Sequence, residues 1–216
     1  MTHSPLIDLA SAMRRAPAQE RSKAKVRAIL DAADELLGEM GYEALVATPW
    51  PIVERAGVTV GAFYHYFEGG EAVLEALGLR YFQSAGELVD ALAGRSYPDW
   101  ESVVDAVVDT YADFYGRPSV RELWLNNRLT AVAKEAGREV NDYIYRTITD
   151  LLESASGGAL RLTPMGARIT NSIGDQLLRL VEDETEPARA EMIIEVKIAM
   201  RSYCRTFLGG PDRPRE

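Results

Sequence analysis

Apolar residues recur at intervals of three and four along most of this chain of 216 residues. Between Lys23 and Met40 the apolar positions are Val26, Ile29, Leu30, Ala33, Leu36, Leu37 and Met40. This spacing predicts an amphipathic helix, and Gly41 ends it because glycine takes the left-handed conformation without a side-chain clash. Similar patterns predict helices over about 71–93, 99–116, 119–135, 138–155, 164–182 and 187–208. No comparable alternating pattern indicates strands, so we expect an all-α fold.

Two shorter helices are predicted after the first one. Thr48 is expected to cap the earlier of them, with Pro49 at the first helical position, where no backbone donor is needed, and Gly57 at its end. Thr59 can cap the next helix, which covers about 60–67. Two helices joined by about three residues that include a glycine are typical of a helix-turn-helix, whose second helix enters the major groove of DNA.

The second of these short helices has two dissimilar sides. Phe63 and Phe67 lie four residues apart on one face and are expected to pack. The residues expected to face outward or to the flanks are Val60, Gly61, Ala62, Tyr64, His65 and Tyr66. Small residues at the start of such a helix let it approach base edges, and tyrosine hydroxyls can bond phosphate oxygens. One side therefore indicates core, and the other needs a partner.

The net charge of −9 argues against a nucleic-acid partner for the chain as a whole, because affinity for DNA depends largely on neutralising phosphates. The distribution of charge changes this picture. Residues 81–216 carry a net −6, whereas residues 14–27 carry +5, from Arg14, Arg15, Arg21, Lys23, Lys25 and Arg27 against Glu20. The simplest interpretation of the basic segment is a solvated tail, and the acidic remainder is not expected to bind DNA.

Other features exclude several classes of protein. The single cysteine, Cys204, excludes an internal disulfide and a cysteine-cluster metal site and fits a reducing compartment. The N-terminus lacks a secretory pattern and no apolar run reaches about 18 residues, so we expect a cytoplasmic protein without a membrane span. The only histidines are His3 and His65, and no HExxH, GxSxG or glycine-rich phosphate loop is present. We therefore expect no enzyme, no catalytic residue, no metal and no cofactor.

Three segments resemble the DNA-binding domain of the TetR (tetracycline-repressor) family: "ILDAADELLGEMGY" (29–42), "ERAGVTVGAFYHYF" (54–67) and "EAVL" (71–74). They occur in the family's order and spacing within the run from about 25 to 77, and this run is about a quarter of the chain. The resemblance implies an all-helical homodimer. It has a three-helix N-terminal DNA-binding domain, a fourth helix that leads to the body, and a larger helical domain for ligand binding and dimerisation.

The expected organisation follows from this resemblance. Residues 1–22 form a flexible basic arm, 23–77 the helix-turn-helix domain, 78–210 the ligand-binding and dimerisation domain, and 211–216 a tail, with the helix 71–93 as the link. By position, the resemblance implies DNA contacts from Lys23, Lys25, Thr48, Trp50, Thr59, Val60, Gly61, Ala62, Tyr64, His65 and Tyr66.

Two departures from the family pattern bear on DNA binding. Family members usually carry a lysine that opens the fourth helix and holds a phosphate, whereas this chain has Gly70, with Glu68 nearby. The earlier short helix opens with Pro49, Trp50 and Pro51 in place of polar residues, and Trp50 either contacts bases or packs against the first helix. Fewer phosphate contacts predict weak operator binding with a shallow dependence on salt.

The body carries many aromatic residues, most of which are expected to be core. In "YADFYGRPSVRELWLNNRL" (111–129) the aromatics alternate with polar groups, a composition typical of small-molecule pockets. The residues predicted to line an effector cavity are Tyr111, Tyr115, Trp124, Asn127 and Arg128.

Two apolar stripes in the last helices predict a dimer interface, through Ile169, Ile173, Leu177, Leu180, Val196, Met200 and Tyr203. A monomer that buries both stripes internally is the alternative. A dimer also suits a protein whose two DNA-binding domains must reach half-sites about one helical turn apart.

The predicted function is a ligand-responsive transcriptional regulator, a repressor by analogy with most of the family. It binds a pseudo-palindromic DNA operator as a homodimer and is released by a small-molecule effector. The alternative is a degenerate member that senses a ligand and acts through protein partners, which the acidic body and the Gly70 and Trp50 departures favour.

Overall fold

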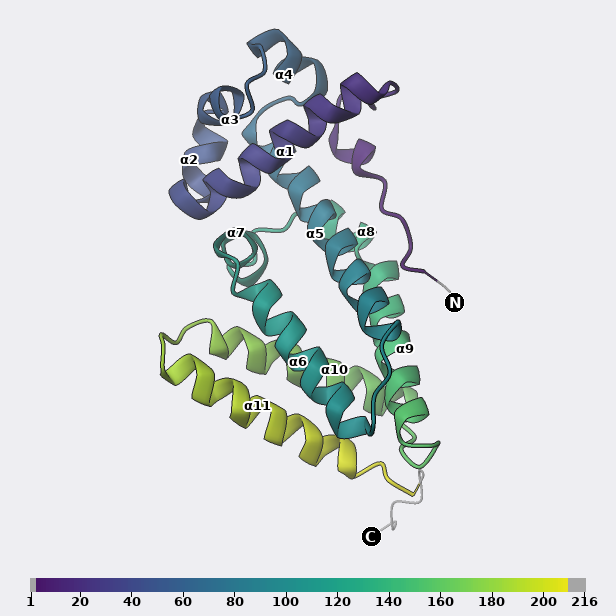
Figure 1. Ribbon diagram of the computed structural model, residues 1–216. Coiled ribbons are helices and arrows are strands. Elements are labelled where there is room, and N and C mark those ends of the chain that lie inside the picture. Colours follow the sequence, from purple (N-terminus) through teal and green to yellow (C-terminus); the bar gives the residue numbers. More distant parts are fainter. Residues whose placement is uncertain (1–2, 210–216) are drawn as a thin grey trace. The chain divides into compact units, whose positions relative to one another are not determined.

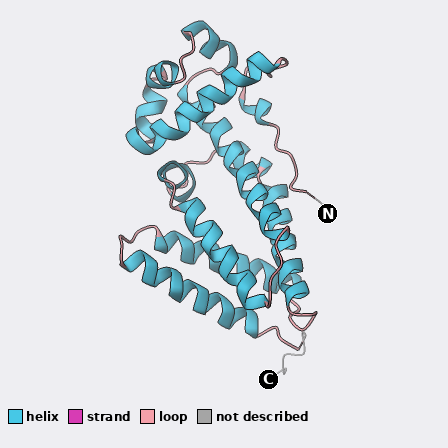
Figure 2. Ribbon diagram, viewed as in Figure 1, coloured by secondary structure: helices cyan, strands magenta, loops and turns pink. Residues whose placement is uncertain are grey.

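The computed structural model describes residues 3–209, so the predicted tail at 211–216 lies outside the described residues. Within this range the regular elements are helical, apart from one antiparallel bridge between Leu160 and Leu208 (Figure 2). The expectation of an all-α fold is confirmed. None of the helices formed by residues 3–209 combines the length and apolar character that crossing a bilayer requires.

The helices divide into two compact units (Figure 1). The head unit comprises Pro5–Ser84 and Arg117–Glu139. The body unit comprises Ala85–Gly116 and the chain from Val140 onward, together with Ser4. The long helix α5 (Gly70–Ala93) therefore gives its first part to the head unit and its remainder to the body unit.

Helices α1 to α4 of the head unit surround a core whose α1 residues the sequence pattern predicted. They are α1 (Glu20–Met40), α2 (Tyr42–Ala47), α3 (Trp50–Arg55) and α4 (Val60–Tyr66). The predicted α1 stripe is buried, except that Met40 in the last position is 45% exposed. The short helix α2 was not predicted. It follows α1 directly because Gly41, at φ +80°, reverses the chain between the two helices.

The remaining helices of the head unit depart from the sequence pattern. The single helix predicted over 119–135 is wrong, because the chain forms α7 (Pro118–Val120), the π-helical turn η2 (Arg121–Leu125) and α8 (Ala131–Ala136). Asn127, at φ +57°, adopts the left-handed conformation and interrupts the helix between η2 and α8. The 3₁₀ turn η1 (Leu9–Ala12) precedes α1.

The body unit is built from long amphipathic helices: α6 (Trp100–Tyr115), most of α9 (Arg138–Ala155), α10 (Pro164–Val181) and α11 (Ala188–Arg205). Side chains cap two of them, since Asp99 accepts from the Ser102 amide at 2.8 Å and Thr163 from the Gly166 amide at 3.0 Å. Helix α11 packs against both α10 and α6. These bounds agree with the predicted ones to within a few residues.

Candidate nucleic-acid interface

Helix α4 is fixed at its start and along one side. Thr59 caps it, and its hydroxyl accepts a hydrogen bond from the Ala62 amide at 3.2 Å, as predicted. Phe63 and Phe67 are fully buried, which confirms the packing side. The turn between α3 and α4 passes through Gly57 at φ +61°, a left-handed conformation that favours glycine. The helix-turn-helix geometry expected from the sequence is therefore present.

The opposite side of α4 is open. Val60 is 44% exposed and Tyr64 is 43% exposed, and Gly61 and His65 are also exposed. A Cβ placed on Gly61 would meet no atom within 4 Å, so this glycine is not required by packing inside the chain. Exposed large apolar side chains beside a position with free access are typical of a surface that receives a partner.

One residue of the predicted contact set, Tyr66, lies elsewhere than expected. Tyr66 is only 7% exposed, so its outward placement is wrong. It lies three residues after Phe63 and one before Phe67, on the side of the helix that packs. Ala62 is half-buried.

Trp50 lies at the start of α3 with 59% of its surface exposed. More than half of the side chain is therefore left open by the predicted alternative in which it packs against Tyr42 and the first helix. The predicted cap is displaced by one residue, because α3 begins at Trp50 and Pro49 occupies the cap position. Thr48 still contributes, since its hydroxyl accepts from the Trp50 amide at 3.3 Å.

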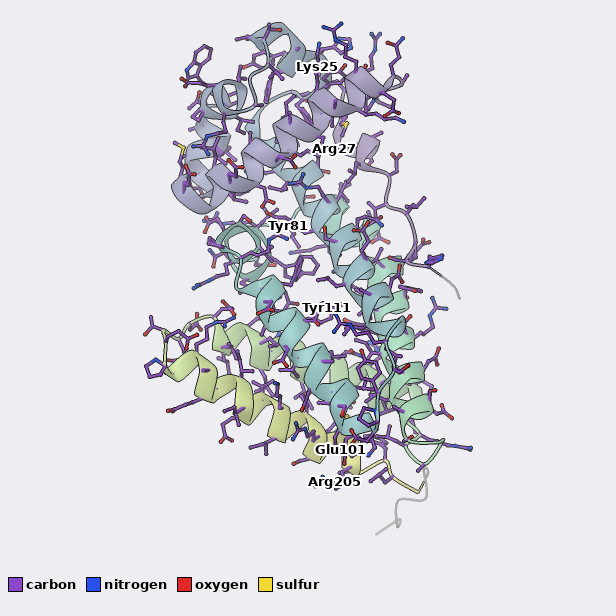
Figure 3. The ribbon with its side chains drawn as sticks, viewed as in Figure 1. Lys25, Arg27, Tyr81, Glu101, Tyr111 and Arg205 are labelled. Atoms are coloured by element: carbon purple, nitrogen blue, oxygen red, sulfur yellow. The ribbon has the colours of Figure 1, made fainter. Side chains whose placement is uncertain are left out.

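The basic residues near the start of α1 differ in how far they are neutralised. Lys23 pairs with Glu20 at 2.8 Å, which holds the pKa of that carboxyl below its ordinary value. Lys25 is half-buried, and Arg27 is exposed on the same helix (Figure 3). On α3, Arg55 pairs with Glu35 and Glu39, and its hydrogen bond lowers the pKa of Glu39. Arg55 is thus neutralised by acidic residues of α1.

Two of the residues predicted to bind an effector lie in the body unit. Tyr111 and Tyr115 are buried, and Figure 3 marks Tyr111. The Tyr111 hydroxyl donates to the Ala85 carbonyl at 3.1 Å, and that of Tyr115 donates to Asp175 at 2.6 Å. Burial raises the pKa of both hydroxyls, and the nearby Asp175 carboxylate raises that of Tyr115 further.

The other three predicted effector residues lie in the head unit. Trp124 stacks obliquely on Phe82, with ring centroids 4.5 Å apart. Asn127 accepts from Lys134 at 2.7 Å. Arg128 pairs with Glu43 at 2.8 Å and lies over the Tyr42 ring, 5.2 Å from its centroid. The structure therefore gathers the five predicted residues in two groups, one in each unit.

A shallow depression in the head unit includes Arg128 but neither Trp124 nor Asn127. It encloses about 180 Å³, open solvent included, and is lined by Tyr42, Leu74, Glu75, Leu123, Arg128, Leu129, Thr130 and Ala133. Because this volume includes open solvent, the depression is not an enclosed cavity of the roughly 300–1,000 Å³ that small-molecule sites usually provide. Among residues 3–209, no group of three or more His, Cys, Asp or Glu side chains is arranged to hold a metal ion.

The predicted dimer residues also separate into two groups. Ile169 and Leu180 on α10 are 40% and 54% exposed, whereas Val196 and Met200 on α11 are buried within the chain. The remaining three, Ile173, Leu177 and Tyr203, are half-buried. The exposed apolar residues of α11 are instead Ile194 and Ile198, at 58% and 49%, with Met165 of α10 at 60%.

The sequence contained a signal for these missed residues. Ile194 and Ile198 are four residues apart, the spacing of one helix face, and Val196 and Met200 form a second such pair displaced by two residues. The sequence pattern does not say which pair faces the core, and for this reason the predicted interface includes the inward pair.

Two family models match this chain. "Bacterial regulatory proteins, tetR family" matches residues 29–77, and "Tetracyclin repressor-like, C-terminal domain" matches residues 99–203. Together they cover more than half of the chain, in the order of the predicted domains. The chain belongs to the TetR family. It is a TetR-family transcriptional regulator, a class that is generally not enzymatic.

Solved structures of other regulators share the fold. A TetR-family transcriptional regulator from Streptomyces coelicolor is 22% identical, with 85% of this chain and 99% of that chain covered and a TM-score of 0.58. The fatty acid degradation regulator FadR from Bacillus halodurans is 20% identical, with 88% of this chain and 97% of that chain covered and a TM-score of 0.58. The TetR-family regulator PfmR from Thermus thermophilus is 18% identical, with 86% of this chain and 99% of that chain covered and a TM-score of 0.55. No curated relative matches the chain.

The head unit of this TetR-family chain explains the departure at Gly70. A Cβ at this position would lie 1.9 Å from the backbone oxygen of Leu45 and 3.1 Å from the Cα of Val46. The start of α5 thus rests directly on the backbone of α2, and only glycine fits there. The lysine that the resemblance led us to expect at this place is excluded by packing.

Proposed function

We propose that the chain is a ligand-responsive repressor that binds a pseudo-palindromic DNA operator as a homodimer and is released by a small-molecule effector. The observation that carries this proposal is the open side of α4. A capped helix with two fully buried phenylalanines on one side presents Val60, Gly61, Tyr64 and His65 on the other. A rigidly seated helix with a small residue near its start suits insertion into the major groove.

Each exposed residue has a distinct role in this proposal. Val60 and Gly61 approach base edges, because the absence of a side chain at Gly61 lets the helix backbone come close to the DNA. Tyr64 and His65 bond phosphate oxygens, which positions the helix without reading sequence. Trp50, exposed at the start of α3, adds an apolar contact to bases.

Dimerisation is proposed to involve the exposed apolar residues of α10 and α11. Met165, Ile169 and Leu180 follow one face of α10, and Ile194 and Ile198 lie on α11. Two such helices from each chain form a four-helix interface. The symmetric pair of α4 helices then reads two half-sites of the operator.

Release by an effector is proposed as a shift between two states. A small molecule that binds the state unable to hold DNA more tightly than the competent state lowers operator affinity by that difference. The buried Tyr111 and Tyr115 are candidates for contacts in the body unit.

The experiment that tests the proposal is selection of binding sites from a random duplex library with purified full-length protein, at low and moderate salt. We expect an inverted repeat to be recovered at both salt concentrations. Gly61→Leu is expected to weaken binding to that repeat by at least about tenfold, the loss that about 1.4 kcal/mol produces. Gly94→Leu is the matched control, because a Cβ at Gly94 meets only ordinary contacts at 3.7 Å and lies in the body unit.

A second candidate function follows from the packing at Gly70, which removes a phosphate contact. The chain would then sense a ligand and act through a protein partner. Folded, dimeric protein that enriches no sequence at either salt concentration would support this second function and contradict the first.

A further inference from the structure

The N-terminal segment is held against the helices of the head unit. The Ile7 amide donates to the side chain of Gln83 on α5 at 3.0 Å. The Asp8 carboxylate caps the turn η1 by accepting from the Ala10 amide at 2.9 Å. Directly after this turn, the Arg14 amide donates to the backbone oxygen of Tyr66 at 2.8 Å. The segment is therefore attached at the C-terminal end of α4.

The two arginines at this attachment remain available to a partner. Arg14 and Arg15 are both exposed, and no carboxylate within the described part of the chain lies at ion-pair distance from either. Some other basic residues of the head unit are neutralised, as Lys23 is by Glu20 and Arg55 by Glu35. In a chain with a net charge of −9, Arg14 and Arg15 place two unpaired cations next to the backbone bond that joins Arg14 to the end of α4.

A cationic contact is lost at Gly70, four residues after Tyr66 in the chain. The packing of α5 on α2 leaves no room for a side chain at Gly70. Because the Arg14 backbone is bonded to Tyr66, less conformational freedom is lost when its guanidinium binds than if the segment were free. A guanidinium binds phosphate oxygens in a planar, bidentate arrangement.

We propose that Arg14 and Arg15 form a phosphate-binding site for the DNA backbone beside the site read by α4, in place of the contact that Gly70 cannot make. This inference rests on the proposed function, since it assumes that α4 binds DNA. The bond between Arg14 and Tyr66 holds the backbone from which both side chains extend next to the end of α4. Phosphate contacts carry no sequence information, so these residues set affinity and orientation and leave operator choice to α4.

The first test compares full-length parent protein with an Arg14→Gln, Arg15→Gln double variant on the selected operator over a range of salt. The substitutions leave the backbone bond to Tyr66 in place. We expect the slope of log affinity against log salt to fall by about 0.9 for each lost phosphate contact, and by up to about 3.6 for the four side chains of a dimer. The selected sequence is expected to be unchanged.

The matched control is the Arg95→Gln, Arg146→Gln double variant. It removes the same charge from exposed positions of the body unit. We expect its salt slope to equal that of the parent. Equal loss in both double variants would mean that net charge, and not position, sets the affinity, and would overturn the proposal.

A second test separates the position of the arginines from their charge. Asp8→Asn and Asp8→Ala raise the net charge equally, but asparagine retains the cap of η1 and alanine loses it. We expect Asp8→Ala to bind the operator about two- to fivefold more weakly than Asp8→Asn. Equal or tighter binding by Asp8→Ala would overturn the proposal that the held segment positions Arg14 and Arg15.

The outcomes distinguish this inference from the proposed function. A parent protein that binds the selected operator while the arginine double variant keeps the same affinity and slope overturns the inference alone. A folded parent protein that binds no duplex overturns both. If only the arginine double variant has a shallower slope of log affinity against log salt, and its selected sequence is unchanged, the result supports both the proposed function and this inference.

Discussion

The guanidinium of Arg117 donates a hydrogen bond to the carboxylate of Asp34 at 2.8 Å. The same carboxylate accepts from the hydroxyl of Tyr81 at 2.5 Å and from Arg80 at 3.2 Å. One side chain of α1 thus connects that helix to α5 and to the residue before α7. Arg117 falls within the part of the chain that the C-terminal family model matches, yet it belongs to the head unit. A change at residue 117 therefore acts directly on α1.

Replacing Asp34 is expected to destabilise the head unit. Its carboxylate is only 20% exposed and accepts from three donors, and Asp34→Ala removes these three hydrogen bonds together. We expect a loss of about 1–3 kcal/mol in the free energy of unfolding, measured by urea titration. Asp31→Ala is the matched control, because Asp31 is 57% exposed where it pairs with Arg80 and its loss is expected to change stability by at most about 1 kcal/mol. Equal losses would contradict the role given to Asp34.

Stability is expected to fall steeply in alkaline solution. Burial raises the pKa of Tyr81, Tyr111 and Tyr115, and the carboxylates of Asp34 and Asp175 raise the pKa of Tyr81 and Tyr115 further. Because the folded chain keeps these hydroxyls neutral while the unfolded chain ionises them above about pH 10, the stability is present below that pH and is lost above it.

Each such tyrosine contributes a slope of about 1.4 kcal/mol per pH unit in this range. The measurement is the free energy of unfolding by urea between pH 8 and pH 11.5, chosen to bracket about pH 10. The Tyr81→Phe variant serves as the comparison and is expected to lose one tyrosine's share of the slope. The ordinary tyrosine pKa is about 10, so pH 11 lies about one unit above it. A free energy of unfolding that stays constant from pH 8 to about pH 11 would contradict this expectation.

Two glycines are expected to respond oppositely to alanine. A Cβ at Gly61 meets open space on a helix, so Gly61→Ala is expected to leave stability unchanged or to raise it by up to about 1 kcal/mol. A Cβ at Gly70 would lie 1.9 Å from a backbone oxygen, so Gly70→Ala is expected to cost about 1–3 kcal/mol. Thermal unfolding of both variants checks this, and a Gly70→Ala protein as stable as the parent would show that α5 does not rest on α2 as described.

The two apolar pairs of α11 are expected to respond differently to a charge. Ile198 is 49% exposed, so Ile198→Glu is expected to keep the fold and to give monomers if this face forms the dimer. Met200 is 8% exposed, with its methyl carbon 3.4 Å from a Cβ placed on Gly174, so Met200→Glu buries an unpaired charge and is expected to unfold the chain. Sedimentation equilibrium and circular dichroism distinguish the two results. A folded dimer of Ile198→Glu would exclude this face as the interface.

Local patterns in the sequence are sufficient for most helical elements and for the core of the α1 to α4 region. The α1 stripe, the Thr59 cap and the inward Phe63 and Phe67 are periodic or local features, so neighbouring residues along the chain specify them. The family followed from the same segments, whose order and spacing the family models match. The break between η2 and α8 was not predicted, because the chain turns there through the left-handed Asn127 and has no glycine or proline to indicate a turn.

Packing between helices sets which side of an apolar helix faces inward and which residues can touch. Tyr66 is buried and Ile194 and Ile198 are exposed, although periodicity alone allowed the reverse. The sequence pattern indicates only a lost phosphate contact at Gly70, and the distance to Leu45 shows that no side chain fits there. The bond between Arg14 and Tyr66 joins residues far apart in sequence. Such contacts depend on all the side chains that surround a residue in the folded chain. The spacing of apolar residues along one helix gives no information about neighbours from other helices.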